Sequence, residues 1–163
     1  MIYEQPSAEN PLSQGDILLQ CPLVYWEMVD NSNYESVTST ETVVVLTQAC
    51  DLANTKTSKV QVAVMHEIQM LVDEKILKPQ TVRDQIRRHR VFGWYFLPAG
   101  NDVPESIVDL RDIHTVPRQL LEQQIASGHR VATLKTPYRE HLAQHFAVTY
   151  SRIALPEPYA TED

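Results

Sequence analysis

Hydrophobic and polar residues alternate along this chain in a pattern that predicts a sheet of short β-strands. Val60, Val62 and Val64 occupy every second position, so they lie on one face of a strand. Residues 43–46 are four apolar residues in succession, which is typical of a strand buried on both faces. Residues 34–42 are polar enough for a loop or an edge strand. The strands expected from these patterns cover residues 14–26, 42–48, 59–65, 92–98, 106–110 and 131–134.

The spacing of apolar residues changes to a helical period between the third and fourth of these strands. Ile68 and Leu71 suit one face of a helix. Pro79 ends this helix, and Thr81 caps a second helix that reaches to about His89. The sequence therefore predicts a helical insertion between two strands.

Two further helices are expected toward the C-terminus. Pro117 opens the first of them, and Gly128 ends it. Thr136 as the N-cap and Pro137 at the first helical position begin the last helix. The pattern as a whole predicts an α+β fold, in which a small, bent antiparallel sheet carries a helical insertion and a C-terminal helix.

The length of the chain predicts one domain over residues 1–163, because it suffices for one core but not for two. The ordered core is expected at about residues 14–156, with loose N- and C-terminal tails. The sequence has no run of about 20 apolar residues and no signal-like N-terminus, so we expect a cytoplasmic protein without a membrane span. Cys21 and Cys50 are too few for a disulfide framework and are expected to be free thiols. No cofactor is expected from the sequence.

The formal net charge of −7 at pH 7 argues against nucleic-acid binding by overall electrostatics. Arginines are nevertheless concentrated in the second expected helix, where Arg83, Arg87 and Arg90 are spaced to lie on one face. With Trp94 nearby, this face can contact the phosphates and stacked bases of a single-stranded RNA. The alternative is a solvated helix face with ion pairs to acidic residues such as Asp84.

Side chains capable of chemistry follow the apolar run at residues 43–46. Cys50, beside Asp51, can act as a nucleophile if His66 or His114 serves as its base. Gln48 can bind a polar ligand or the edge of a base. The alternatives are structural, because a free cysteine is commonly part of a core and short polar side chains commonly cap backbone groups.

Two histidines in the last expected helix are four residues apart. His141 and His145 therefore share one helix face, from which both could ligate a metal ion. No third ligand is evident nearby, and the H-E-x-x-H pattern is absent. The sequence favours an exposed helix face and no metal site.

Three segments, in this order, resemble the PemK/MazF-like toxins, which are small proteins with an SH3-like barrel that typically cut RNA. The segments are residues 15–17 (Gly-Asp-Ile), 43–47 and 104–116, within a resemblance that covers about residues 14–121. The resemblance implies that the bent sheet closes toward an SH3-like barrel. It also implies RNA as a target, and it makes an antitoxin or other protein partner and a homodimer candidates.

Two departures from that family bear on function. The toxins usually carry an arginine just before the second strand, which stabilises charge on the scissile phosphate, whereas residues 38–41 here are Thr-Ser-Thr-Glu. They also tend to place Ser or Thr at the end of the next strand, where this chain has His66. A ribonuclease needs a base and a cation, for which His66 and either Arg83 or Arg87 are the candidates.

Three functions are therefore open. The first is a toxin-related protein that engages or cleaves RNA. The second is a non-enzymatic module on the same barrel, which binds a ligand or a partner after loss of the nuclease residues. The third is a cysteine-dependent hydrolase. The predicted catalytic residues are His66, Cys50 and Asp51, and the predicted substrate-binding residues are Gln48, Arg83, Arg87, Arg90 and Trp94.

Overall fold

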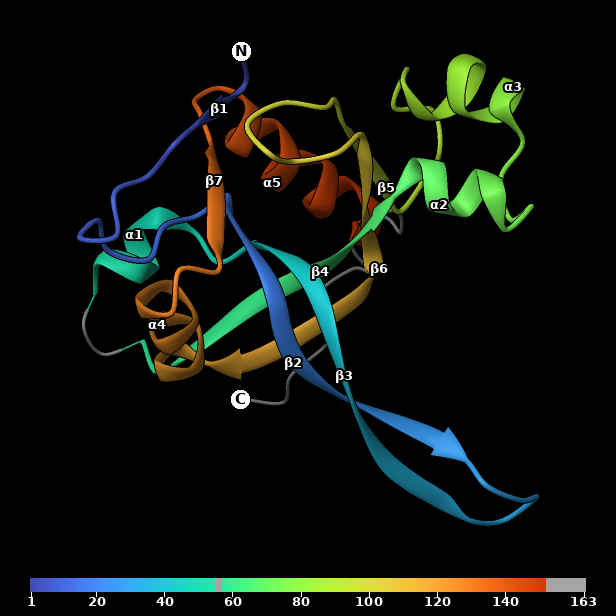
Figure 1. Cartoon of the computed structure of the whole chain (residues 1–163), viewed down its shortest axis with the longest axis horizontal. Helices are drawn as coiled ribbons and strands as arrows, with labels where there is room; N and C mark the ends of the chain where they lie inside the picture. Colours follow the sequence, from blue (N-terminus) through green and yellow to red (C-terminus); the bar gives the residue numbers. More distant parts are fainter. Residues whose placement is uncertain (55–56, 152–163) are drawn as a thin grey trace, which may run out of the picture.

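The computed structural model describes residues 1–54 and 57–151 of the chain, and the expected C-terminal tail lies outside them. Seven strands form one antiparallel sheet in the order β1-β7-β2-β3-β4-β6-β5 (Figure 1). The strands are β1 (Tyr3–Glu4), β2 (Asp16–Met28), β3 (Tyr34–Val45), β4 (Lys59–Glu67), β5 (Trp94–Leu97), β6 (Ser106–Pro117) and β7 (Arg130–Leu134). The helices are α1 (Ala49–Ala53), α2 (Ile68–Asp73), α3 (Pro79–Thr81), a π-helical turn η1 (Val82–Ile86), α4 (Arg118–Ala126) and α5 (Tyr138–Tyr150).

This arrangement confirms the predicted α+β class, the bent antiparallel sheet and the C-terminal helix. The sheet is open, since the order of the described strands ends at β1 on one side and at β5 on the other. Irregularities in strand pairing coincide with the bend. The register shifts between Leu18 and Cys21 of β2 and between Ala63 and Val64 of β4. Such bulges bend a strand and increase its twist.

The middle of the sheet is buried on both faces, as the run of apolar residues predicts. Val44 and Ala63 pack on one face, in a cluster that includes Leu142 of α5. Val43 and Val45 point to the other face, where the core is completed by residues of α4. Helices α4 and α5 therefore cover opposite faces of the same central strands (Figure 1).

The predicted helical insertion is present, but its boundaries differ from those expected. Helix α2 ends at Asp73, and Pro79, which was expected to end it, instead begins the second helical segment. The insertion comprises α2, α3 and η1, whose apolar side chains form a separate small core with Ile107 of β6. Regular structure ends at Ile86 instead of about His89. In its last turn the N–H of Arg87 bonds to the carbonyl of Val82, five residues back, as in a π-helix. His89 then adopts a positive φ of 52°, a left-handed conformation that does not continue a helix.

A long hairpin of β2 and β3 extends from the body of the protein. Residues 34–42, for which a loop or an edge strand was an alternative, are largely strand and pair with β2 as far as Met28. We call the distal part, residues 24–38, the arm; Figure 1 shows no other element lying over it. Its side chains are mostly exposed, and the tip is closed by Asp30, whose carboxylate accepts hydrogen bonds from Ser32 and Asn33.

The N-terminal segment, expected to be loose, is instead attached to the sheet. β1 pairs with β7, and Tyr3 is buried with its hydroxyl donating to the carbonyl of Pro98 at 2.7 Å. The guanidinium of Arg130 donates to the carbonyls of residues 7, 10 and 11 at 2.7–3.1 Å. One buried arginine of β7 therefore fixes the path of the chain before β2.

The last helix begins one residue later than the sequence indicates. Pro137 occupies the N-cap position of α5, and the hydroxyl of Thr136 donates to the carboxylate of Glu140 at 3.0 Å instead of capping the helix. Among the described residues, no helix combines the length and the apolar character needed to cross a membrane.

Candidate functional site: an acidic cavity beside the bent sheet

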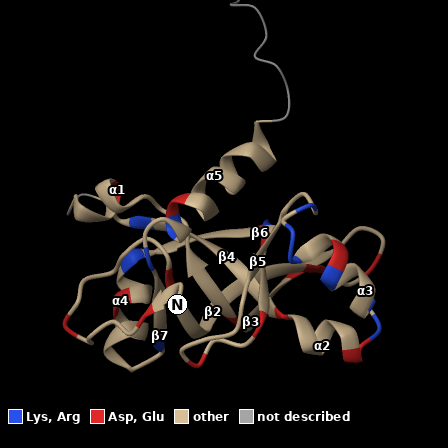
Figure 2. Cartoon of the chain, turned by 90° about the horizontal axis from the view of Figure 1, so that it is seen from above, with Lys and Arg blue, Asp and Glu red and all other residues tan. Residues whose placement is uncertain are grey.

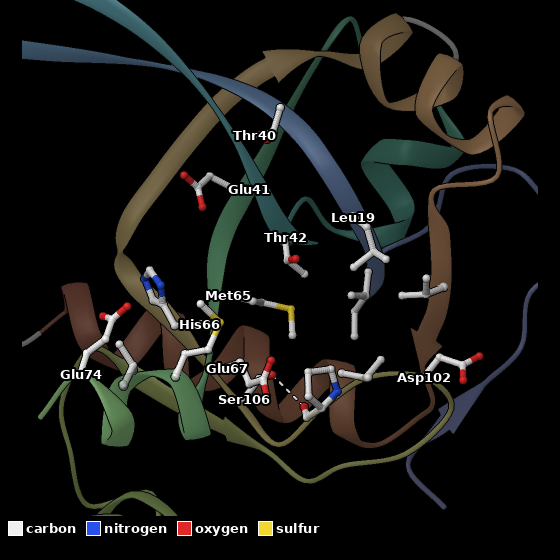
Figure 3. Close-up of a pocket in the computed structure, with 16 residues that line it drawn as sticks. Leu19, Thr40, Glu41, Thr42, Met65, His66, Glu67, Glu74, Asp102 and Ser106 are labelled. Atoms are coloured by element: carbon white, nitrogen blue, oxygen red, sulfur yellow. Dashed lines mark hydrogen bonds between the residues drawn. The ribbon is translucent and has the colours of Figure 1, made fainter. Parts of the chain in front are cut away.

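A cavity of about 570 Å³ lies where the bent sheet meets α2 and the loop before β6. Residues of β2, β3, β4, β6 and β7 contribute to its wall, and Figure 3 shows these strands curving around it. The bulge in β2 and the register shift between β4 and β6 produce this curvature. The size suits a small ligand or a single large side chain.

Four carboxylates line the cavity: Glu41 of β3, Glu67 of β4, Glu74 after α2, and Asp102 of the loop. No lysine or arginine of the described residues is part of the lining. None of the four forms an ion pair with a residue in the part of the chain that the structure describes. Carboxylates gathered around a low-dielectric wall produce a negative potential that attracts cations and repels phosphate.

His66, predicted as a catalytic base, lines this cavity at the end of β4. Its ring is half-buried and stands between Glu41 and Glu74 in Figure 3. The ring has no hydrogen-bond partner among the described residues, so both nitrogens are available to a ligand. A base beside carboxylates but without a cation lacks the group that a ribonuclease needs to stabilise the phosphate.

The inner wall of the cavity is apolar. Ile17, Met65 and Leu71 contribute aliphatic and thioether surface, with Val103 and Val131 beside them. A cation on an aliphatic stem matches this combination, because the stem can lie on the apolar wall while the charged head reaches the carboxylates. Arginine and lysine side chains each combine an aliphatic stem with a charged head.

The predicted residues Gln48 and Asp51 line a different cavity, at the other end of β4. Cys50 is exposed in α1, where its thiol lies 3.6 Å from the Gln48 side-chain oxygen and 3.9 Å from an Asp51 oxygen. Gln61 of β4 also lines this second cavity, whereas His66 is five residues further along the strand. At the rise of a strand this separation is about 16 Å. The structure does not bring Cys50 and His66 into one site.

The other candidate base for Cys50 is occupied elsewhere. His114 lies 2.8 Å from a carboxylate oxygen of Asp112 and packs edge-on against the ring of Tyr25 at 4.8 Å between centroids. No histidine of the described residues lines the cavity next to Cys50. Cys21 is fully buried, and this burial raises its pKa to about 11, so that thiol is unreactive.

The arginines of the insertion are exposed but do not share one helix face. Arg83 pairs with Asp84 at 3.2 Å, and Arg87 pairs with Glu105 at 2.8 Å. Arg90 follows the end of η1, so the expected spacing of one helical face does not extend to it. Figure 2 shows the basic segments of the insertion beside α3.

Trp94, predicted to stack on a base, is a half-buried residue of β5. It packs against the small core of the insertion instead of standing beside the arginines on the surface. The thiol segment therefore lies apart from His66, and none of the arginines of the insertion lines the cavity that holds His66.

Three histidines gather at one further place, between the insertion and α5. The rings of His89 and His145 lie 6.1 Å apart and both pack against Tyr95, while His141 lines the same shallow cavity. The sequence pattern did not reveal His89 as a neighbour. Within residues 1–54 and 57–151, no group of three or more His, Cys, Asp or Glu side chains is arranged to hold a metal ion.

Acidification is expected to destabilise the protein through this cluster. Burial lowers the pKa of His89 and of His145 below the ordinary value, and the neighbouring histidines lower that of His89 further. As the pH falls below about 6.5, the unfolded chain binds these protons first, so the free energy of unfolding decreases. Thermal melts at pH 7.5 and 5.5 should show a smaller loss in Tm for His89→Gln than for the wild type. An equal loss in both would contradict this role.

The sequence did not reveal the acidic cavity, because its four carboxylates come from separate elements and none is part of a motif. One signal was available in the sequence. No lysine or arginine occurs before residue 56, so strands β1, β2 and β3 carry acidic but no basic side chains. The sequence alone also did not show which apolar residues would form the wall of the cavity.

Comparison with protein-family models and with curated proteins gives no match for this chain. The resemblance to PemK/MazF-like toxins therefore depends on three short segments, and it remains a prediction. The protein is an α+β chain with a bent, open sheet and an acidic cavity beside it.

Proposed function

We propose that this protein is a non-enzymatic binding module whose acidic cavity takes a cationic side chain, arginine or lysine, from a partner protein. One observation carries the proposal. Four carboxylates that form no ion pair with a described residue line a cavity, and no lysine or arginine of residues 1–54 and 57–151 is part of its lining. A cation supplied by a partner would compensate this charge.

The shape and the wall of the cavity support the same ligand. Its apolar inner wall can accept the aliphatic stem of a long side chain, and Glu41 and Glu74 lie on either side of His66 near the rim (Figure 3). A guanidinium or an ammonium group would donate charge-assisted hydrogen bonds to these carboxylates.

The same geometry bears on the alternative of RNA cleavage in this cavity. The toxins usually have an arginine just before their second strand, whereas residues 38–41 of this chain are Thr-Ser-Thr-Glu, and Glu41 of this stretch lines the cavity. A carboxylate in place of a guanidinium disfavours a phosphate and favours a cation. The cavity therefore supports partner binding more than nuclease chemistry.

The proposal predicts binding of an arginine peptide that depends on charge. Titration of the protein with the peptide acetyl-Gly-Arg-Gly-amide, followed by NMR chemical shifts, should give saturable shifts at His66 and Met65. The same peptide with citrulline, a neutral isostere of arginine, should bind at least about tenfold more weakly, because hydrogen bonds between charged groups are stronger.

Variants of the protein complete this test. Glu41→Gln with Glu74→Gln should lower the affinity for the arginine peptide about tenfold or more. Glu4→Gln with Glu9→Gln is the matched control, since both carboxylates are exposed and outside the cavity, and it should bind normally. Equal affinity for the arginine and citrulline peptides, or no effect of the cavity variant, would exclude the proposal.

A second candidate is RNA binding by the insertion, where Arg83, Arg87, Arg88 and Arg90 are all exposed. The favouring observation is that Arg88 and Arg90 form no ion pair with any described residue. A single-stranded RNA of mixed sequence, titrated in the same experiment at low salt, addresses this candidate. Binding that disappears in Arg88→Glu with Arg90→Glu would support it, and absence of binding would remove it.

A further inference from the structure

The two faces of the arm differ in chemistry. The pairing of β2 with β3 places Val24, Trp26 and Met28 on one face, with Tyr34 opposite Met28. All four side chains are exposed, and Trp26 is 73% exposed. A contiguous apolar stripe on an extended hairpin is unusual for a surface that remains in water.

The other face of the arm carries an electrostatic conflict. Glu27 and Glu35 are directly opposite each other in the ladder. Like charges at such positions destabilise a strand pair. Neither carboxylate has an ion-pair partner among the described residues, and the chain has no lysine or arginine before residue 56. A cation from outside the arm would relieve this repulsion.

The helical insertion has the complementary surface. Arg88 and Arg90 are exposed and lack ion pairs among the described residues, as noted above. Two large apolar side chains, Ile76 at 62% and Phe92 at 51%, are exposed on the same insertion. The arm thus offers apolar and acidic groups, and the insertion offers apolar and basic groups. The two project from the body in different directions, so the contact is not made within one chain (Figure 1).

We infer that the arm of one copy of this protein docks on the insertion of a second copy. A two-fold axis would place each arm on the insertion of the other copy, so that the contact forms twice and the assembly closes. Glu27 and Glu35 then face Arg88 and Arg90 of the partner, whereas the stripe around Trp26 lies on the opposite face of the arm and is not needed for this contact. This inference is independent of cation binding in the cavity.

A charge exchange between the two surfaces tests this dimer by sedimentation velocity in 50 mM salt. The wild type is expected to dimerise, and 500 mM salt should weaken the dimer. Reversal of the arm, Glu27→Lys with Glu35→Lys, or of the insertion, Arg88→Glu with Arg90→Glu, should raise the dissociation constant on the order of 100-fold. An equimolar mixture of the two reversed proteins should dimerise again, because each arm then meets an insertion of opposite charge.

The control variant, Glu4→Lys with Glu9→Lys, changes the net charge as much as the arm variant does, at exposed positions outside the arm. It should dimerise like the wild type. Three results overturn the inference: a wild type that stays monomeric up to the highest concentration tested, a dimer that survives both reversals, or reversed proteins that stay monomeric when mixed.

Discussion

Replacement of Arg130 by alanine is expected to lower the free energy of unfolding by about 3–5 kcal/mol, as measured by urea denaturation. Arg130 and Asp16 form a buried ion pair at 2.9 Å. Asp16 also accepts hydrogen bonds from the hydroxyl of Thr133 and from the backbone N–H of Ser13. Without the guanidinium, a carboxylate with no exposed surface would lose its countercharge.

The loss would reach beyond the ion pair, because Arg130 also holds three backbone carbonyls of the N-terminal segment. The carbonyls of Asn10 and Pro11 would lose this donor, whereas that of Ser7 would keep the N–H of Asn10, so the segment between β1 and β2 would be held less firmly. Arg130→Ala should therefore also increase amide hydrogen exchange in residues 7–13.

Two variants distinguish the effect of the uncompensated buried charge on stability from the effect of removing any arginine. Asp16→Asn in the Arg130→Ala background removes the uncompensated carboxylate and should recover part of the lost stability. Arg139→Ala, which removes a surface pair with Glu140, should change stability by less than about 1 kcal/mol. An effect of Arg130→Ala as small as that of Arg139→Ala would contradict the structural role of the pair.

The second large effect is expected at Gly15, the residue before β2. Gly15 has a φ of +84°, and a Cβ added there would lie 2.9 Å from the Cβ of Leu134. Its N–H donates to the carbonyl of Val45, and its carbonyl accepts from the N–H of Leu134, so the backbone is held between β3 and β7. Gly15→Ala should lower the free energy of unfolding by about 2–4 kcal/mol, from backbone strain and overpacking together.

Gly128 is the matched control for this substitution. Its φ of +79° is nearly the same, but a Cβ added there would meet no atom within 4 Å. Gly128→Ala should therefore show the backbone strain alone, about 1–2 kcal/mol. Equal losses in urea denaturation for the two variants would mean that contact with Leu134 contributes nothing.

The positions of most strands and helices along the chain were predictable, because the apolar residues within Val43 to Val45 and Val60 to Val64 follow the patterns of buried strands. The order of the strands in the sheet was not predicted. The length of the arm could not be predicted from the sequence. Val24, Trp26 and Met28 alternate with less apolar residues as in any half-buried strand, yet in the monomer they face solvent. Alternation indicates that a face is apolar, and it carries no information on what covers that face.

The candidate site was predictable only in part. His66 was identified from its place at the end of a strand, and it does line a cavity. The carboxylates around it could not be assigned, because Glu41 and Asp102 are 61 positions apart in the sequence and meet only through the bend of the sheet. Cys50 and His66 are each accessible enough for chemistry, but sequence spacing could not reveal that they lie near opposite ends of β4.

The arm also bears on how the protein avoids uncontrolled self-assembly. From Cys21 to Met28, β2 pairs only with β3, and β3 pairs with β4 only from Thr42 onward among the described strands. The hairpin therefore presents two free edges, each able to accept another strand. Repulsion between the carboxylates of Glu27 and Glu35 and those of a stacked neighbour would oppose such growth into fibrils, so the groups that weaken the hairpin also protect it.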